Sequence, residues 1–176
     1  MTAPPDPHTV LITAERIDAR VRELAVEIRR DYGPSAELHL VAVLKGAFVF
    51  LADLIRDLTG PVTLDFLAVS SYARGTASSG EVRLLKDLDA RIEGRDVLIV
   101  EDIVDSGLTM AYLQRLLRAR APRTLRTVCL LSKPARRQGQ TQVDYVGFEI
   151  DDRFVVGYGL DYRERYRGLR EIVTLG

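Results

Sequence analysis

The chain has 176 residues, with 25 basic and 25 acidic side chains and therefore no formal net charge, and 47% of its residues are hydrophobic. This length fits one domain with a sizeable core. Zero net charge disfavours binding of nucleic acid across the whole surface, and no apolar run approaches the ~20 residues of a membrane span. The start, Met1–His8, is proline-rich and lacks the basic and apolar regions of a signal peptide. We expect a disordered tail at residues 1–9 and a single domain at residues 10–176.

The cysteine and histidine content argues against a disulfide or a zinc site. Cys129 is the single cysteine and lies in an apolar run, so we expect a buried, inert thiol and a cytoplasmic protein. His39 lies in a predicted strand and His8 in the expected tail, which leaves no ligand set for zinc.

The N-terminal half alternates helical and strand patterns. Residues 13–31 predict an amphipathic helix that begins at the N-cap Thr13, with Ile17, Val21 and Leu24 in its buried stripe. The elements expected after it are a strand at residues 37–44, a helix at 46–58, a strand at 62–70, a polar loop at 71–80 and a short strand at 82–85.

The most informative segment begins at Val97–Val100, which is apolar on both faces as in a central parallel strand. Glu101, Asp102 and Asp105 follow it, and the turn Ser106–Thr109 opens a helix. In open α/β sheets, ligands bind at this carboxyl edge. The free N–H groups, the hydroxyls and the helix dipole of such a turn suit a phosphate. The acids suit a hydrated Mg²⁺ or the hydroxyls of a ribose.

The C-terminal third consists mainly of short strands. We expect them at residues 126–132, 143–148, 154–156 and 172–175. The order of strands and helices along the whole chain predicts a mainly parallel twisted sheet flanked by helices, and there is no internal repeat.

The thirteen residues from Val97 to Thr109 closely resemble the 5-phosphoribosyl 1-pyrophosphate signature of the type I phosphoribosyltransferases. The resemblance implies that family's α/β fold, with a small C-terminal hood that binds the base. It implies that Ser106, Gly107, Leu108 and Thr109 hold the sugar phosphate. It also implies that Glu101 and Asp102 contact the ribose hydroxyls or a Mg²⁺ ion. Adjacent strand residues point to opposite faces, so both acids reach the ligand only if the strand ends there; otherwise Asp102 acts from behind another group.

Lys45 and Gly46 lie at a second junction between a strand and a helix. A lysine followed by a glycine for close backbone approach suits a pyrophosphate. In the similar phosphoribosyltransferases this short loop binds pyrophosphate, and the peptide before the lysine is often cis. The chain has only three lysines among its 25 basic residues, which favours a specific role for Lys45 and Lys133.

The loop at residues 71–80 is small-chained and polar, so we expect it to be mobile. Its Ser-Ser-Tyr start resembles the flexible loop that closes over the site in purine phosphoribosyltransferases. A lid would keep water from the activated sugar. Ser71 and Tyr72 are the residues expected to reach the ligand.

Two C-terminal segments, residues 131–134 and 152–162, resemble the base-binding elements of hypoxanthine-guanine phosphoribosyltransferases. A lysine donor there selects a carbonyl over an amino group, which favours hypoxanthine or guanine over adenine. One departure is Asp151, where the family pattern has proline. The roles implied by the resemblance are a donor to the purine carbonyl for Lys133, stacking for Phe154, reading of the ring edge for the Val155 backbone, a Mg²⁺ ligand for Asp161 and a pyrophosphate contact for Arg167.

The resemblance implies transfer of a phosphoribosyl group to a 6-oxopurine, with Mg²⁺ as cofactor and Asp105 as the acid that faces purine N7 and handles its proton. It implies small-molecule substrates, no nucleic acid or membrane partner, and a homodimer or homotetramer. Two alternatives stay open at this point. One is a phosphoribosyltransferase for another base, such as xanthine or uracil, and the other is an RNA-binding regulator that shares the fold. A dinucleotide-binding oxidoreductase is disfavoured, because no Gly-x-Gly-x-x-Gly follows a strand.

Overall fold

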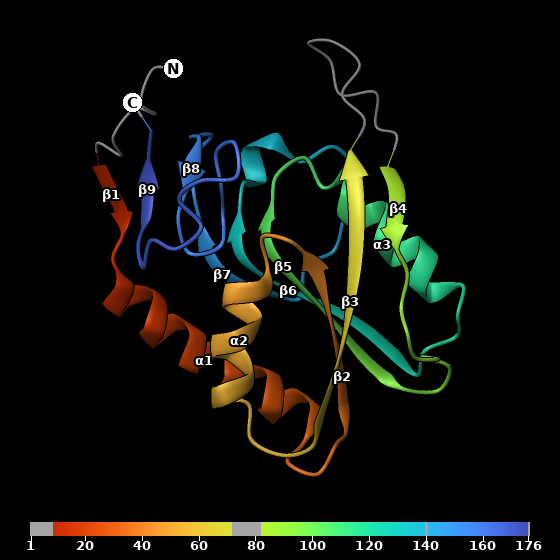
Figure 1. Ribbon diagram of the computed structural model, residues 1–176. Coiled ribbons are helices and arrows are strands. Elements are labelled where there is room, and N and C mark those ends of the chain that lie inside the picture. The colour runs from red at the N-terminus through yellow and green to blue at the C-terminus, as the bar shows by residue number, and fades with distance from the viewer. Residues whose placement is uncertain (1–8, 72–81, 140, 176) are drawn as a thin grey trace.

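The computed structural model describes residues 9–71, 82–139 and 141–175 (Figure 1). These residues form a six-stranded sheet flanked by helices and a separate three-stranded sheet. No helix among them is long and apolar enough to cross a membrane. The strands of the larger sheet are β2 (Leu38–Leu44), β3 (Val62–Ser71), β4 (Val82–Lys86), β5 (Asp96–Val104), β6 (Thr124–Ser132) and β7 (Tyr145–Glu149).

The order of the strands in the larger sheet is β4-β3-β2-β5-β6-β7. All neighbours are parallel except β3 and β4, which are antiparallel. From β2 the chain proceeds outward to β3, whereas from β5 it proceeds outward in the other direction to β6. The loops that follow β2 and β5 therefore diverge at the point where the strand order reverses, which is where open α/β sheets bind ligands.

Three α-helices in the described part of the chain cover the two faces of this sheet. α1 (Ala14–Tyr32) and α2 (Phe48–Asp57) share one core cluster with β2, and α3 (Leu108–Arg118) packs with Val97 and Ile99 in the other. The Thr13 hydroxyl accepts from the backbone N–H of Arg16 at 3.4 Å, which confirms the predicted N-cap. The amphipathic stripe predicted for the first helix is buried, because its apolar side chains face the sheet.

The smaller sheet joins the two ends of the chain. β1 (Thr9–Ile12), β9 (Ile172–Thr174) and β8 (Val155–Val156) pair antiparallel in that order. The sequence did not predict β1, because four residues are too few for a periodic pattern and their partner is at the opposite end of the chain. Thr9, placed in the expected tail, begins this strand; the rest of that tail lies outside the described residues.

The strand of the central motif is longer than predicted. β5 continues beyond Val100 because Glu101, Ile103 and Val104 keep their ladder partners in β6. Two of the acids therefore lie on a strand and not after it. Because adjacent residues of a strand point to opposite faces, the extension of β5 decides which of Glu101 and Asp102 faces the ligand-binding edge of the sheet.

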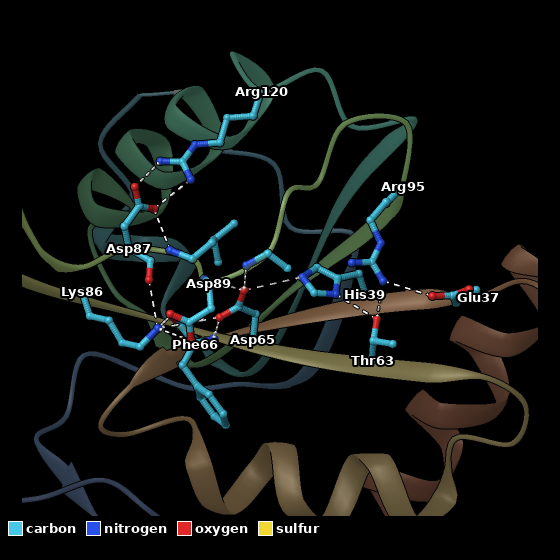
Figure 2. Close-up of polar contacts among 12 residues, drawn as sticks. Glu37, His39, Thr63, Asp65, Phe66, Lys86, Asp87, Asp89, Arg95 and Arg120 are labelled. Atoms are coloured by element: carbon cyan, nitrogen blue, oxygen red, sulfur yellow. Dashed lines mark hydrogen bonds and ion pairs between the residues drawn. The ribbon is translucent and has the colours of Figure 1, made fainter.

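A buried polar group lies between β2 and β3 (Figure 2). His39 is 1% and Asp65 4% exposed. The Nδ1 atom of His39 is hydrogen-bonded to the Thr63 hydroxyl at 2.9 Å, whereas its Nε2 atom has no hydrogen-bond partner among the described residues and lies 4.0 Å from Oδ2 of Asp65. Asp65 Oδ2 accepts from the backbone N–H groups of Asp89 and Ala90, both at 2.9 Å, and so fastens the segment before β5 to β3. The prediction that His39 is a strand residue is confirmed.

We predict that His39 makes folding sensitive to pH. Burial lowers the pKa of His39, and Arg95 lowers it further, whereas Asp65 and Glu37 act in the opposite direction. The unfolded chain, in which histidine titrates near pH 6.5, then binds more protons than the folded chain as the pH falls below about 6.5. The free energy of unfolding should decrease over that range.

Urea unfolding at several values between about pH 8 and pH 5 measures this loss. His39→Gln should flatten the dependence of the free energy of unfolding on pH, whatever it does to stability at pH 8. Equal pH dependence in the variant and the parent protein would show that His39 does not titrate differently in the two states.

Candidate active site

The loop after β2 brings Lys45 and Gly46 to the edge of the sheet. The peptide between Leu44 and Lys45 is cis, as the resemblance implied. The Lys45 ammonium lies 3.1 Å from Oε2 of Glu164, and both side chains are about two-thirds exposed. A Cβ atom on Gly46 would lie 1.6 Å from Oδ2 of Asp102. The glycine is therefore required for the close approach of this loop to β5.

The two adjacent acids of β5 have different surroundings. Glu101 is 8% exposed and Asp102 packs against Gly46. Burial raises the pKa of Glu101 well above its usual range, and the charge of Asp102 raises it further. Burial also raises the pKa of Asp102, and the hydrogen bond with Glu101 lowers it by less. The backbone N–H of Asp102 donates to Oε1 of Glu101 at 3.2 Å, which holds the Glu101 side chain against its own strand.

The turn after β5 has the form of an anion-binding helix start. Gly107 has φ +83° and precedes the first residue of α3. Its carbonyl accepts from the Thr141 hydroxyl at 3.0 Å, and the Ser106 carbonyl accepts from the N–H of Gln138 at 2.8 Å. These bonds hold the turn at the start of α3, where the N–H of Leu108 donates to the Ser106 hydroxyl at 3.4 Å.

The smaller sheet and its loops carry the C-terminal residues of the site. Phe154 is 55% exposed and meets Tyr162 edge-on at 5.7 Å between ring centroids. Val155 is buried in β8. Asp161 pairs with Arg167 at 3.0 Å, and Arg167 also donates to the Gly159 carbonyl at 2.8 Å. These loops thus present an exposed aromatic ring and a guanidinium that is held by two contacts.

Most of the residues predicted for the site meet at one cavity of about 340 Å³. It is lined by Lys45, Gly46, Asp102, Ile103, Asp105, Lys133, Phe154, Val155, Leu160, Asp161 and Arg167. Sequence reasoning missed Ile103 and Leu160, which are apolar residues inside the recognised segments and carry no chemical signal of their own. Glu101 and the turn Ser106–Thr109 do not line the cavity, although Asp105 connects the turn to it.

Lys133 is the most deeply buried cation of the cavity, at 6% exposed. Its ammonium lies 3.8 Å from Oδ2 of Asp105. The backbone N–H of Lys133 donates to the Val104 carbonyl at 3.0 Å, which ties the end of β6 to the end of β5. The candidate base reader and the candidate proton acceptor are therefore neighbours, although they are far apart in the sequence.

Two predictions cannot be compared with the structure. Ser71 ends β3, opposite Val82, and its side chain is outside the described part of the chain. Tyr72 and the remaining residues of the expected lid also lie outside it.

A second, larger cavity of about 610 Å³ lies between α1, α2 and residues 167–170, with charges of both signs, and shares only Arg167 with the predicted site.

The family model of the phosphoribosyl transferase domain matches residues 11–163, and the chain belongs to this family. A hypoxanthine-guanine phosphoribosyltransferase of Mycobacterium avium is 54% identical over 177 residues, which cover 98% of this chain and 87% of the relative. The protein of the same name from Bacillus subtilis strain 168 is 50% identical over 97% of this chain and 94% of its own length.

Solved structures agree with this assignment. A crystal structure of a hypoxanthine-guanine phosphoribosyltransferase from Bacillus anthracis, with a HEPES molecule in its active site, has a TM-score of 0.93 at 45% identity. The match covers 97% of this chain and all of that one. The type I phosphoribosyltransferase fold expected from the sequence is confirmed, with its mainly parallel sheet, its flanking helices and the smaller C-terminal sheet.

We predict that Gly46→Ala destabilises the protein, because the added methyl group overlaps the Asp102 carboxylate. Overpacking of this kind typically costs roughly 1–3 kcal/mol in the free energy of unfolding. Gly168→Ala is the matched control, since no atom of the described part of the chain lies within 4 Å of a Cβ atom at that position. Chemical denaturation of both variants measures the difference. A Gly46→Ala protein as stable as the control would mean that the loop and Asp102 are free to separate.

Proposed function

We propose that the chain acts in purine salvage. It transfers the phosphoribosyl group of 5-phosphoribosyl 1-pyrophosphate to hypoxanthine and guanine, giving IMP or GMP and pyrophosphate. The observation that carries the proposal is the 340 Å³ cavity, in which a buried lysine, an exposed phenylalanine and the acid of the phosphoribosyl signature meet. Relatives named for this reaction, about half identical over nearly the whole chain, support the same assignment.

We assign recognition of the base to the C-terminal residues that line the cavity. We assign Lys133 as the donor to the purine carbonyl, because an ammonium has hydrogens to donate and no acceptor for an amino group. Phe154 offers an exposed ring for stacking. The buried backbone of Val155 reads the edge of the base. A buried donor that an adenine leaves unpaired discriminates strongly against it.

We assign binding of the sugar phosphate and the pyrophosphate mainly to the loops that follow β2 and β5, where the strand order reverses. Ser106, Gly107, Leu108 and Thr109 form the phosphate turn through their N–H groups and hydroxyls. Lys45 and Gly46 face the pyrophosphate from the β2 side, and Arg167 from the hood. Ser71 and Tyr72 belong to the proposed lid, which excludes water.

We propose Mg²⁺ as the cofactor. Asp102 and Asp161 line the same cavity, and their oxygens suit this ion, which is commonly held by one or two carboxylates together with substrate phosphates. No cluster of three metal-binding side chains occurs among the described residues. When bound, the ion neutralises charge on the leaving pyrophosphate. Glu101 does not line the cavity but accepts a hydrogen bond from the Asp102 backbone, so it is assigned to support Asp102, while Asp102 contacts the ion or the ribose hydroxyls.

In the reaction, a ring nitrogen of the base forms a bond to the sugar carbon that carries the pyrophosphate, and the carbon–oxygen bond to pyrophosphate breaks. Positive charge develops on the ribose, which the carboxylates of the cavity stabilise. Asp105 faces N7 of the purine and takes or shares the proton there. Enclosure of the site keeps water from the same carbon.

We propose a homodimer or homotetramer, as is usual in the family. Phe48 on α2 and Leu64 on β3 are 44% and 42% exposed, and such large apolar side chains suit contact with another copy. We also propose a cytoplasmic location, which the buried free thiol of Cys129 supports. Size-exclusion chromatography with light scattering measures the assembly.

A panel of bases with phosphoribosyl pyrophosphate and Mg²⁺ tests the proposed activity. Hypoxanthine and guanine should yield nucleotide, whereas adenine and uracil should not, because they do not match a lysine donor aimed at the 6-oxo group of a purine. Nucleotide formation is followed by absorbance and chromatography. Preference for uracil, or turnover of adenine at a comparable rate, would contradict the assignment.

We predict that Asp105→Asn lowers kcat by about 10²–10⁴-fold, the usual contribution of a general acid or base. The amide keeps the size of the side chain but cannot accept the proton. The KM for phosphoribosyl pyrophosphate should change little, because the phosphate is held by neighbouring N–H groups and hydroxyls. Asp151→Asn, at a side chain that is 87% exposed, is the matched control. Turnover near the parent level would show that Asp105 only caps the start of the helix, a role that asparagine fills equally well.

A further inference from the structure

Four charged side chains form a closed ring at one wall of the cavity. The Lys133 ammonium lies 3.8 Å from Oδ2 of Asp105 and 3.5 Å from Oδ1 of Asp152. Arg136 contacts the other oxygen of each carboxylate, with Nε 2.7 Å from Oδ1 of Asp105 and Nη1 3.0 Å from Oδ2 of Asp152. The ring holds two positive and two negative charges. Arg136 was not predicted from the sequence as part of the site, and Asp152, at the start of a segment that resembles a base-binding element, was given no role.

The four members are unequally buried. The Lys133 side chain is 8% exposed, whereas those of Asp105, Arg136 and Asp152 are between 43% and 52% exposed. A buried ammonium requires nearby anions to be stable. Both carboxylates supply this charge from distances longer than the usual 2.7–3.2 Å of a hydrogen bond. The ammonium is therefore neutralised by its neighbours and keeps hydrogens for another acceptor.

The position of Arg136 accounts for this geometry. Arg136 ends the short 3₁₀ helix Pro134–Arg136, three residues after Lys133, and its backbone N–H donates to the Lys133 carbonyl at 3.1 Å. Its planar guanidinium spans the two carboxylates, which a single ammonium would do less well. The hydrogen bond from Arg136 holds the pKa of Asp152 below its usual value, so this carboxylate stays ionised.

The members of the ring differ in whether they line the cavity. Lys133 and Asp105 line the cavity, whereas Arg136 and Asp152 do not. Oδ1 of Asp105 is buried and lies next to Arg136, although the donor is not aligned for a hydrogen bond, and Oδ2 is the oxygen on the Lys133 side. Without Arg136, both carboxylates would be free to close on the remaining cation, Lys133, and to occupy its hydrogens.

We propose that Arg136 is a positioning residue: it holds Asp105 and Asp152 back from Lys133, so that the ammonium and Oδ2 of Asp105 stay available to the base. This inference rests on the proposed function and deepens it. Arg136 acts through its neighbours and need not touch the substrate. It determines recognition of the 6-oxopurine and has no part in binding phosphoribosyl pyrophosphate.

Steady-state kinetics of Arg136→Ala, Arg136→Lys and the control Arg153→Ala test the proposal. Arg153 is in the adjacent loop, is 56% exposed and pairs only loosely with Asp151, at 4.0 Å, so its removal deletes the same charge outside the ring. Arg136→Ala should lower kcat/KM for hypoxanthine by about 10–100-fold, as misplacement of binding groups does. The KM for phosphoribosyl pyrophosphate should stay within about twofold of the parent value.

The conservative variant and the control sharpen this expectation. Arg136→Lys should recover part of the lost activity, because it keeps the charge but not the guanidinium that spans two carboxylates. Arg153→Ala should behave as the parent protein. Equal loss in Arg136→Ala and Arg153→Ala would overturn the proposal, since it would point to a general effect of charge. An equal rise in the KM values for hypoxanthine and for phosphoribosyl pyrophosphate would also overturn the proposal.

A double-mutant cycle with Lys133→Ala separates positioning from a structural role. If Arg136 acts through the Lys133 ammonium, Arg136→Ala should change the KM for hypoxanthine far less in the Lys133→Ala background than in the parent. Additive effects would overturn the proposal. Thermal unfolding of each variant establishes that it is folded; if Arg136→Ala is not, the same cycle with Arg136→Lys decides the question.

The experiment also distinguishes this inference from the proposed function. A parent protein that forms no nucleotide from hypoxanthine or guanine would contradict the proposed function. A parent protein that is active, together with an Arg136→Ala variant that matches it, would contradict only the role of Arg136.

Discussion

The parallel pairing of β2 with β5 is the constraint on which the rest of the site depends. It places two strand ends side by side, and the strand order reverses between them. The loops that follow can therefore approach closely, and the absence of a side chain on Gly46 lets the first loop touch Asp102. A sheet with another strand order would separate the lysine of one loop from the acids of the other, and no common cavity would form.

Burial of charge at this edge has an energetic cost that the structure offsets by pairing. Lys133 is nearly inaccessible to water and is balanced by two half-exposed carboxylates, which are in turn shared with Arg136. A neutral ring of four charges is more easily kept in a protein interior than a single ammonium. The same arrangement leaves the ammonium incompletely hydrogen-bonded, which is the condition that a donor to a substrate must meet.

The hood adds the residues that the sheet cannot supply. β8 and β9 pair with β1 from the other end of the chain, and this short sheet fixes Val155 and its exposed neighbour Phe154 beside the cavity. Arg167, which lines the same cavity, is held by the Gly159 carbonyl and by Asp161. In the proposed function, Phe154 stacks on the base and this guanidinium contacts the pyrophosphate.

Local patterns of the sequence determined the fold class, and its resemblance to the type I phosphoribosyltransferases pointed to most of the residues that line the cavity. The apolar run before Glu101, the turn at Ser106–Thr109 and the N-cap Thr13 each carry their information within a few residues. Tertiary structure alone decided how far β5 extends, since its last pairs depend on β6, and hence that Asp102 and not Glu101 faces the cavity. It also decided that Arg136 and Asp152 join the site, because a charge gains a specific role only from the partners that folding brings within reach.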